Sequence, residues 1–179
     1  AKNAGADLVF LPIYYQQASL ILTQCKSANY NPTFFGCDGL DGLLSIKNFD
    51  TSLCEGVMLL TPFAADAQDQ ATQDFVKKYK DAYKGETPNQ FAADAYDGVM
   101  VLAELMKKEG ITADMSASDI CDKLKKAITD KDFSYDGLTG TGMKWGEDGA
   151  VSKDPKAVII KNGAYSALTA DDIAASTAQ

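Results

Sequence analysis

An acidic side chain and a group of aromatic and polar side chains follow two predicted strands of this 179-residue chain. Asp38 comes shortly after one short apolar segment, and Tyr14, Tyr15 and Gln16 come after another. A carboxylate beside aromatic faces is suited to hold an ammonium group with an apolar substituent, because charge pairing, cation–π attraction and burial of apolar area act together. These four residues are therefore a candidate ligand-binding site.

Each of these residues also has a purely structural interpretation. Asp-Gly pairs form many turns without any ligand, and local sequence does not separate a turn-forming Asp38 from a cation-binding one. The second pair, Asp41-Gly42, favours the turn interpretation. A tyrosine after a strand also packs over the following helix in many proteins, so both interpretations stay open for the two tyrosines.

The predicted elements around the candidate site indicate an α/β fold in which a parallel sheet is flanked by helices. Residues 7–11 form a continuous apolar run closed by Pro12, which predicts a strand buried on both faces. Residues 18–28 repeat apolar positions at helical spacing, and residues 33–36 predict a second strand. Since parallel neighbours end at the same edge of a sheet, both candidate segments should meet there.

Further elements follow along the chain. Residues 56–61 predict another buried strand, and three amphipathic helices succeed it. The expected apolar positions of these helices are Phe75, Val76, Tyr79, Ala82 and Tyr83 in the first, Ala92, Ala95, Tyr96, Val99, Leu102, Ala103 and Met106 in the second, and Ile120, Cys121, Leu124, Ala127 and Ile128 in the third.

Local signals mark where several elements begin, turn and end. Ser116 with Asp119 resembles a capping box at the start of the third helix. Asn162-Gly163, between two β-rich segments, predicts a hairpin with a type I′ turn. The Ala-, Ser-, Thr- and Asp-rich tail after residue 168 is expected to be loose.

Composition excludes several functional classes. Seventeen basic residues against twenty-five acidic ones give a formal net charge of -8, which disfavours nucleic acid as a partner. The chain has no His and no Arg, so Ser-His-Asp and Cys-His catalysis and His-containing zinc sites are absent. The Gly-rich run at residues 140–142 lacks the phosphate-loop pattern. We therefore expect no enzyme activity, no metal site and no cofactor.

The four cysteines show neither a CxxC pair nor metal-ligand spacing. Cys25 and Cys121 lie on apolar helical faces and are expected in the core. Cys37 and Cys54 are expected as thiols, with a bridge between them as the alternative.

Several landmarks together resemble a known family. ADLVFLPIYYQQASLILTQCKSANYNPTFFGCDGLDG, CEGVMLLTPF, ETPNQFAADAYDGVMVLAELMKKEG and YDGLTGTGMKWGEDGAV are similar to successive segments of the branched-chain amino-acid type of substrate-binding protein, the type I periplasmic binding proteins of ABC importers. The resemblance covers the second half of a full member, so we expect a partial bilobed fold and a piece of a longer protein.

The resemblance implies a domain plan and a binding site. Residues 1–61 would belong to the second lobe, residues 62–142 would return to the first lobe as helices, and residues 143–179 would supply a hinge, the terminal hairpin of the second lobe and a tail. Asp38 would hold the ligand's ammonium group, Tyr14 would contact the ligand, and Phe91 in the QFAADAYD motif matches a further pocket position. Tyr15 and Gln16 depart from the family pattern, which leaves side-chain specificity open.

The implied function is extracytoplasmic capture of an amino acid, delivered to a membrane permease. The alternative is the ligand-sensing domain of a receptor or transcription regulator, which a DNA-binding domain encoded upstream would identify. An enzyme of flavodoxin-like or dehydrogenase type lacks its glycine fingerprints here. Exposed sheet edges predict that the fragment exchanges elements between molecules or dimerises.

Overall fold

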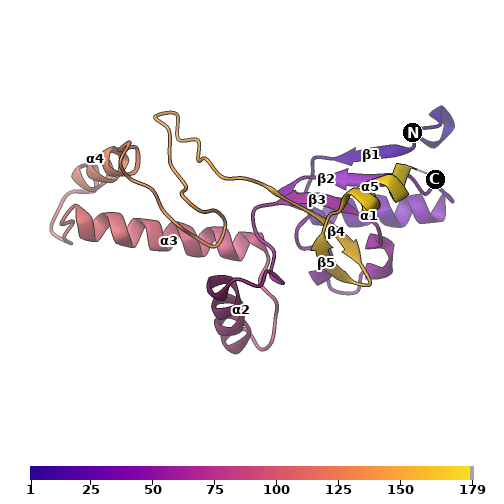
Figure 1. Cartoon of the computed structure of the whole chain (residues 1–179), viewed down its shortest axis with the longest axis horizontal. Helices are drawn as coiled ribbons and strands as arrows, with labels where there is room; N and C mark the ends of the chain where they lie inside the picture. Colours follow the sequence, from indigo (N-terminus) through magenta and orange to yellow (C-terminus); the bar gives the residue numbers. More distant parts are fainter. Residues whose placement is uncertain (178–179) are drawn as a thin grey trace. The chain divides into compact units, whose positions relative to one another are not determined.

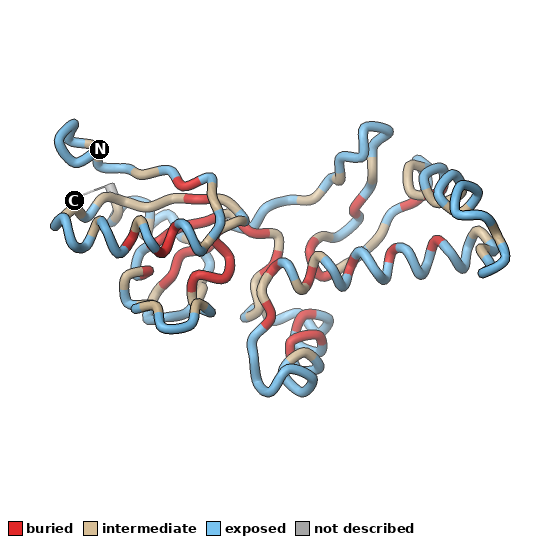
Figure 2. The backbone as a smooth tube through the Cα atoms, turned by 180° about the vertical axis from the view of Figure 1, so that it is seen from behind, coloured by how far each residue is buried: buried red, intermediate tan, exposed pale blue. Residues whose placement is uncertain are grey.

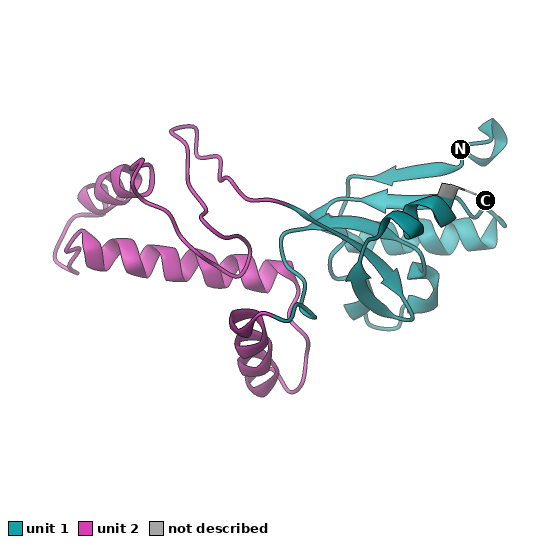
Figure 3. Cartoon of the chain, viewed as in Figure 1, with its two compact units in different colours: residues 1–68, 155–179 teal, residues 69–154 magenta. Residues whose placement is uncertain are grey.

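The computed structural model describes residues 1–177 and divides them into two compact units (Figures 1 and 3). Unit 1 comprises residues 1–68 and the residues described from 155 onward, and unit 2 comprises residues 69–154. The strands of the chain are β1 (Leu8–Leu11), β2 (Thr33–Gly36), β3 (Met58–Thr61), β4 (Lys156–Lys161) and β5 (Ala164–Ala167). The α-helices of the chain are α1 (Tyr15–Ser27), α2 (Gln70–Ala82), α3 (Gln90–Lys108), α4 (Ala117–Ile128) and α5 (Ala170–Thr177), and its 3₁₀ turns are η1 (Lys2–Ala4), η2 (Asp38–Leu40), η3 (Leu43–Ser45) and η4 (Thr51–Cys54).

Unit 1 is built on one five-stranded sheet in the order β1-β2-β3-β4-β5. The first three strands are parallel, and α1 makes the connection between β1 and β2. The last two form an antiparallel hairpin whose turn residues, Asn162 and Gly163, have φ angles of 52° and 74°. The predicted α/β class, the βαβ unit and the hairpin are therefore confirmed.

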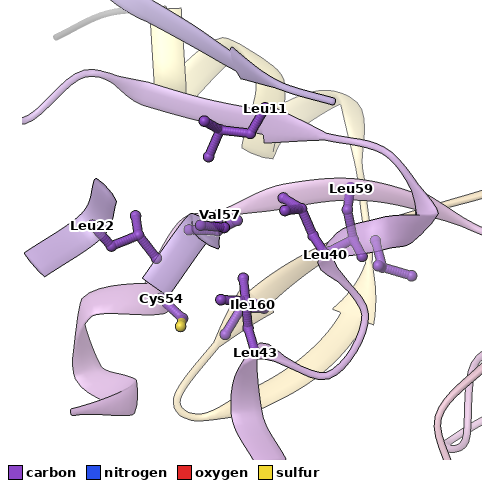
Figure 4. Packing of buried hydrophobic residues seen from close by; sticks show 10 residues of the cluster. Leu11, Leu22, Leu40, Leu43, Cys54, Val57, Leu59 and Ile160 are labelled. Atoms are coloured by element: carbon purple, nitrogen blue, oxygen red, sulfur yellow. The ribbon is translucent and has the colours of Figure 1, made fainter. Parts of the chain in front are cut away.

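The core of unit 1 lies between α1 and one face of the sheet (Figure 4). Ala18 and Leu22 of α1 meet Leu11, Leu59 and other buried side chains of the strands. Full burial of one such side chain contributes about 1.5–3 kcal/mol to the free energy of unfolding. The same cluster takes in Leu40, Leu43 and Cys54, so the loops after β2 are anchored in the core as well.

The expectation that the first strand is buried on both faces is wrong. Leu8 and Phe10 are 53% and 52% exposed, because β1 is an edge strand and α1 covers only the face that carries Leu11. The ring of Phe10 stacks on Phe35 of β2, with 5.9 Å between ring centroids. A continuous apolar run therefore does not distinguish a central strand from an edge strand with one open face.

Residues 170–177 form α5, so the prediction of a loose tail is wrong for them, and its last two residues lie outside the described part of the chain. The Thr169 hydroxyl donates to the Asp172 carboxylate at 2.8 Å, and the Asp172 N–H donates back to that hydroxyl at 3.3 Å. Lys161 of β4 forms an ion pair with Asp172. Thr33 of β2 donates its hydroxyl to the Ser176 carbonyl at 3.1 Å. A reciprocal cap and contacts with two strands thus order a segment whose composition is typical of a loop.

The three predicted helices of unit 2 are confirmed as α2, α3 and α4. Each begins at a side chain that accepts a backbone N–H: Asp69 from Thr72, Asn89 from Ala92, and Ser116 from Asp119. The Ser116 hydroxyl also donates to the Asp119 carboxylate at 2.7 Å, so the capping box is confirmed.

The buried face of α3 differs from the expected one (Figure 2). The helix buries Ala93, Asp97, Val101 and Leu105, whereas residues of the expected face such as Val99 and Leu102 are 65% and 45% exposed. The buried side packs on α4 and on the segment that follows it, through residues that include Ala127 and Phe133. Because α3 carries apolar residues on two sides, its pattern alone did not identify the side that packs within unit 2.

The cysteine expectations are confirmed only in part. Cys121 is exposed and Cys25 is half-buried, so the placement of Cys121 in the core is wrong. Cys54 is buried, and burial raises the pKa of its thiol to about 11. All four cysteines are free thiols, and the alternative of a bridge between Cys37 and Cys54 is not realised. Within residues 1–177 no helix has the length and apolar character to cross a membrane.

Candidate functional site

The candidate site lies at the carboxyl ends of β1 and β2. The two strands are parallel, and their last aligned pair is Leu11 with Gly36. The chain leaves β1 toward Tyr14 and leaves β2 toward Asp38, so both segments emerge at one edge of the sheet. This is the position at which parallel sheets bind ligands.

The two segments touch through their backbones. A Cβ atom on Gly39 would lie 2.6 Å from the Ile13 carbonyl oxygen and 3.5 Å from the Tyr14 Cα atom. Position 39 therefore has room only for glycine, and the residue after Asp38 lies directly against Tyr14. The predicted meeting of the two segments is thus present in the fold.

Asp38 is the first residue of η2, and its side chain is exposed. Its carbonyl accepts the Asp41 N–H at 2.9 Å, which closes the short 3₁₀ turn through backbone atoms. The carboxylate is therefore at the surface of the rim, where it is accessible to a cationic group.

The neighbouring side chains divide into exposed and supporting ones. Tyr14 precedes α1 and is 61% exposed, and Gln16 in the first turn of α1 is also exposed. Tyr15 is half-buried and packs against the core of unit 1. A Cβ on Gly42 would lie 2.9 Å from the Tyr15 ring, so that ring covers the end of the loop after β2. Tyr14 and Gln16 remain the more accessible candidates.

Phe91 belongs to unit 2 and is the second residue of α3. It is 36% exposed. The rim formed by Tyr14 and Asp38 belongs to unit 1, so Phe91 is a separate prediction from the cluster described above.

The contact between the side chains of Asp41 and Tyr165 was not predicted from the sequence. Asp41 is only 5% exposed, and it forms a side-chain hydrogen bond with Tyr165 of β5. The Gly42 N–H donates to the Tyr165 hydroxyl at 3.2 Å, and φ of Gly42 is 119°. Asp41-Gly42 is therefore a turn, as predicted. Tyr165 lies 123 residues beyond Gly42, and no local sequence pattern predicts that the two residues are in contact.

A second buried acid organises unit 2. Asp97 of α3 accepts the backbone N–H of Leu138 at 2.9 Å, and the N–H and hydroxyl of Thr139 at 2.8 Å each. Lys153 donates to Asp94 at 2.7 Å and to the Thr139 hydroxyl at 3.0 Å. The Gly-rich segment is thus fixed to α3 by this network, which gives residues 137–140 a structural role.

Across residues 1–177, no group of three or more Cys, Asp or Glu side chains is placed to hold a metal ion.

The three parallel strands, the antiparallel hairpin and the separate helical unit together define one portion of a type I periplasmic-binding-protein fold. The sequence profile of the periplasmic binding protein family matches residues 1–164, and the chain belongs to that family. The resemblance to the branched-chain amino-acid type of substrate-binding protein is confirmed by this match and by the similarities that follow.

Three relatives illustrate the similarity. The leucine-, isoleucine-, valine-, threonine- and alanine-binding protein of Pseudomonas aeruginosa is 29% identical over 110 residues, which are 61% of this chain and 28% of that protein. The branched-chain amino-acid transporter substrate-binding protein LivJ of Streptococcus pneumoniae, solved with isoleucine, has a TM-score of 0.72 and 23% identity, covering 90% of this chain and 43% of that one. A solute-binding protein of an ABC transporter from R. palustris, solved with benzoate, has a TM-score of 0.74 and 18% identity, covering 93% and 43%. The chain thus spans less than half the length of these relatives.

Proposed function

We propose that this chain is the C-terminal portion of the extracytoplasmic solute-binding component of an ABC importer, and that the complete protein captures an amino acid of the branched-chain or a related type. The observation that carries the proposal is that the segments carrying the exposed Asp38 and Tyr14 meet at one sheet edge in a chain of this family. No bond is made or broken. The captured ligand is handed to a membrane permease.

In this proposal Asp38 is the counter-ion of the ligand's ammonium group. Tyr14 covers the apolar substituent, Tyr15 and Gln16 shape the edge of the pocket, and Phe91 contributes from the other lobe. The ligand's carboxylate is held by hydroxyls and backbone N–H groups of the first lobe that lie outside this chain. The lobes close over the ligand by a hinge motion.

The lobe plan belongs to the same proposal. Residues 1–61 contribute to the second lobe, residues 62–142 return to the first lobe, and residues 143–179 form the hinge, the terminal hairpin and the tail. The order of the two compact units along the chain supports this plan, since residues 69–154 separate the two parts of unit 1.

The test uses the full-length protein and a panel of amino acids, with benzoate as a carboxylate that lacks an ammonium group. Because a ligand that binds only the folded state raises its stability, thermal unfolding identifies the ligand and calorimetry then gives its affinity. Asp38→Asn should weaken amino-acid binding about 100-fold, as expected when a buried ammonium group loses its counter-ion at a loss of about 3 kcal/mol.

The matched control is Asp81→Asn. Asp81 is an exposed residue of α2 paired with Lys77, and its substitution changes the net charge equally. It should leave the affinity unchanged. Equal affinities of the Asp38→Asn protein and the wild type would remove Asp38 from the site, and stabilisation by benzoate alone would replace the amino acid with an aromatic carboxylate.

A further inference from the structure

Tyr165 joins the terminal hairpin to the loop that carries Asp38. Its hydroxyl accepts the Gly42 N–H at 3.2 Å and donates to the carboxylate of Asp41. Both contacts lie at the end of residues 37–42, which we call the 37–42 loop, and Asp41 is only three residues from Asp38. One side chain of β5 thus binds two consecutive residues of this loop.

Apolar anchors fix the loop on its other side. Leu40 and Leu43 are completely buried in the core of unit 1, and the ring of Tyr15 covers Gly42. These contacts set the depth of the loop but give no directional constraint on its backbone, whereas hydrogen bonds do. The Tyr165 hydroxyl supplies that directional contact.

The Tyr165 hydroxyl can act as a hydrogen-bond donor to Asp41 at neutral pH. Burial, and next the charge of Asp41, raise the pKa of the Tyr165 phenol, so the group keeps its proton at neutral pH. Asp41 in turn is 5% exposed, and a buried carboxylate without a donor would be strongly destabilised. The buried pair of Asp41 and Tyr165 therefore joins the end of the loop to β5.

We propose that Tyr165 is a positioning residue for ligand binding, whose hydroxyl, through Asp41 and the Gly42 N–H, holds the 37–42 loop so that Asp38 faces the ligand's ammonium group. This inference rests on the proposed function, because it assigns Tyr165 to the same site. It adds to that site a residue of the C-terminal hairpin that does not itself touch the ligand.

The test measures amino-acid affinity of the full-length protein with Tyr165→Phe, which keeps the ring and removes the hydroxyl. Affinity should fall about tenfold, which corresponds to about 1.4 kcal/mol. Tyr30→Phe is the matched control, because it also deletes a phenol hydroxyl of unit 1, which donates to the Ala6 carbonyl at 2.7 Å. It should leave the affinity unchanged.

A double-mutant cycle with Asp38→Asn separates positioning from general stability. If Tyr165 acts through Asp38, Tyr165→Phe should have no further effect on affinity once Asp38 is Asn. An undiminished tenfold loss in that background, or an unchanged affinity of the single variant, overturns the inference while the proposed function stands. Unchanged affinity of Asp38→Asn itself overturns both.

Asp41→Ala provides a second route if the Tyr165→Phe protein does not fold. It removes the acceptor at the loop end and should give a comparable loss that also disappears in the Asp38→Asn background. Hydrogen exchange of residues 37–42 should rise in both variants, and unchanged exchange together with unchanged affinity overturns the inference.

Discussion

Two Asp-Gly pairs three residues apart have opposite surroundings. Asp38 is exposed at the rim of the sheet, whereas Asp41 is buried against Tyr165. The difference arises because Leu40 and Leu43 enter the core on either side of Asp41 and draw its backbone inward. Asp38 is therefore accessible at the surface, whereas Asp41 connects the loop to the hairpin.

The strongest residue-level prediction for stability concerns Asp97. Asp97→Ala leaves three donors of Leu138 and Thr139 without their acceptor and should lower the free energy of unfolding by about 2–3 kcal/mol. Urea unfolding of the full-length protein measures this change. Asp122→Ala, at an exposed position of α4, is the control and should change stability by less than about 0.5 kcal/mol. Equal effects of the two substitutions would contradict the anchoring role of Asp97.

Sequence reasoning succeeded at this scale where the partners were close in the chain or where a general rule of sheet topology brings them together. The meeting of the Asp38 and Tyr14 segments follows from the rule that parallel neighbours end at one edge, and the Ser116 cap from its spacing to Asp119. Tyr165 and Asp97 were missed because their hydrogen bonds span more than 40 residues. Such pairings depend on tertiary folding, which leaves no local pattern.

At the scale of elements, the sequence predicted which segments are helices and strands better than which faces they bury. The helix α3 was predicted, yet its buried side carries Asp97 together with Ala93, Val101 and Leu105. A hydrophobic count favours the opposite side, which carries Val99 and Leu102. The hydrogen bonds from residues 138–139 to Asp97, as well as the burial of apolar area, determine which side of α3 packs within unit 2. The pattern of apolar residues in the sequence does not predict these hydrogen bonds.

The attachment of α5 should depend on pH through Asp172. Hydrogen bonds from Lys161 and then Thr169 lower the pKa of Asp172 from its ordinary 3.8 to about 2. A carboxylate with a depressed folded pKa contributes stability that is present above its unfolded pKa and is lost as the pH falls through its folded value. The contribution should therefore disappear between about pH 4 and pH 2.

The measurement is hydrogen exchange of residues 170–177 over this pH range, after correction for intrinsic exchange rates. Protection should fall with acid in the wild type, and Asp172→Asn should already have low protection at neutral pH. Asp171→Asn, a neighbouring exposed acid in the first turn of α5, should keep the wild-type profile. Protection of the Asp172→Asn protein equal to wild type would show that the cap and the Lys161 pair do not hold the helix.

For the molecule as a whole, large apolar side chains are exposed in both units. On α3 the residues are Tyr96, Val99, Met100, Leu102 and Met106, and on β1 they are Leu8 and Phe10. Soluble monomers rarely expose contiguous apolar patches of this kind, which usually mark surfaces for association. The chain spans less than half the length of its relatives, so these surfaces are candidates for contacts that a longer chain would make.

The isolated 179-residue chain should therefore self-associate. Burial of exposed apolar area drives association, and the free edge of β1 offers strand pairing in addition. Sedimentation velocity over a concentration series should show the sedimentation coefficient rising with concentration.

A Val99→Lys, Leu102→Lys protein should associate more weakly, because a charge placed in an apolar contact loses its hydration. Ser118→Lys, at an exposed position of α4, adds a charge outside the patch and should behave like the wild type. Sedimentation as a monomer at every concentration would rule out the association, whereas undiminished association of the α3 variant would assign it to the β1 edge.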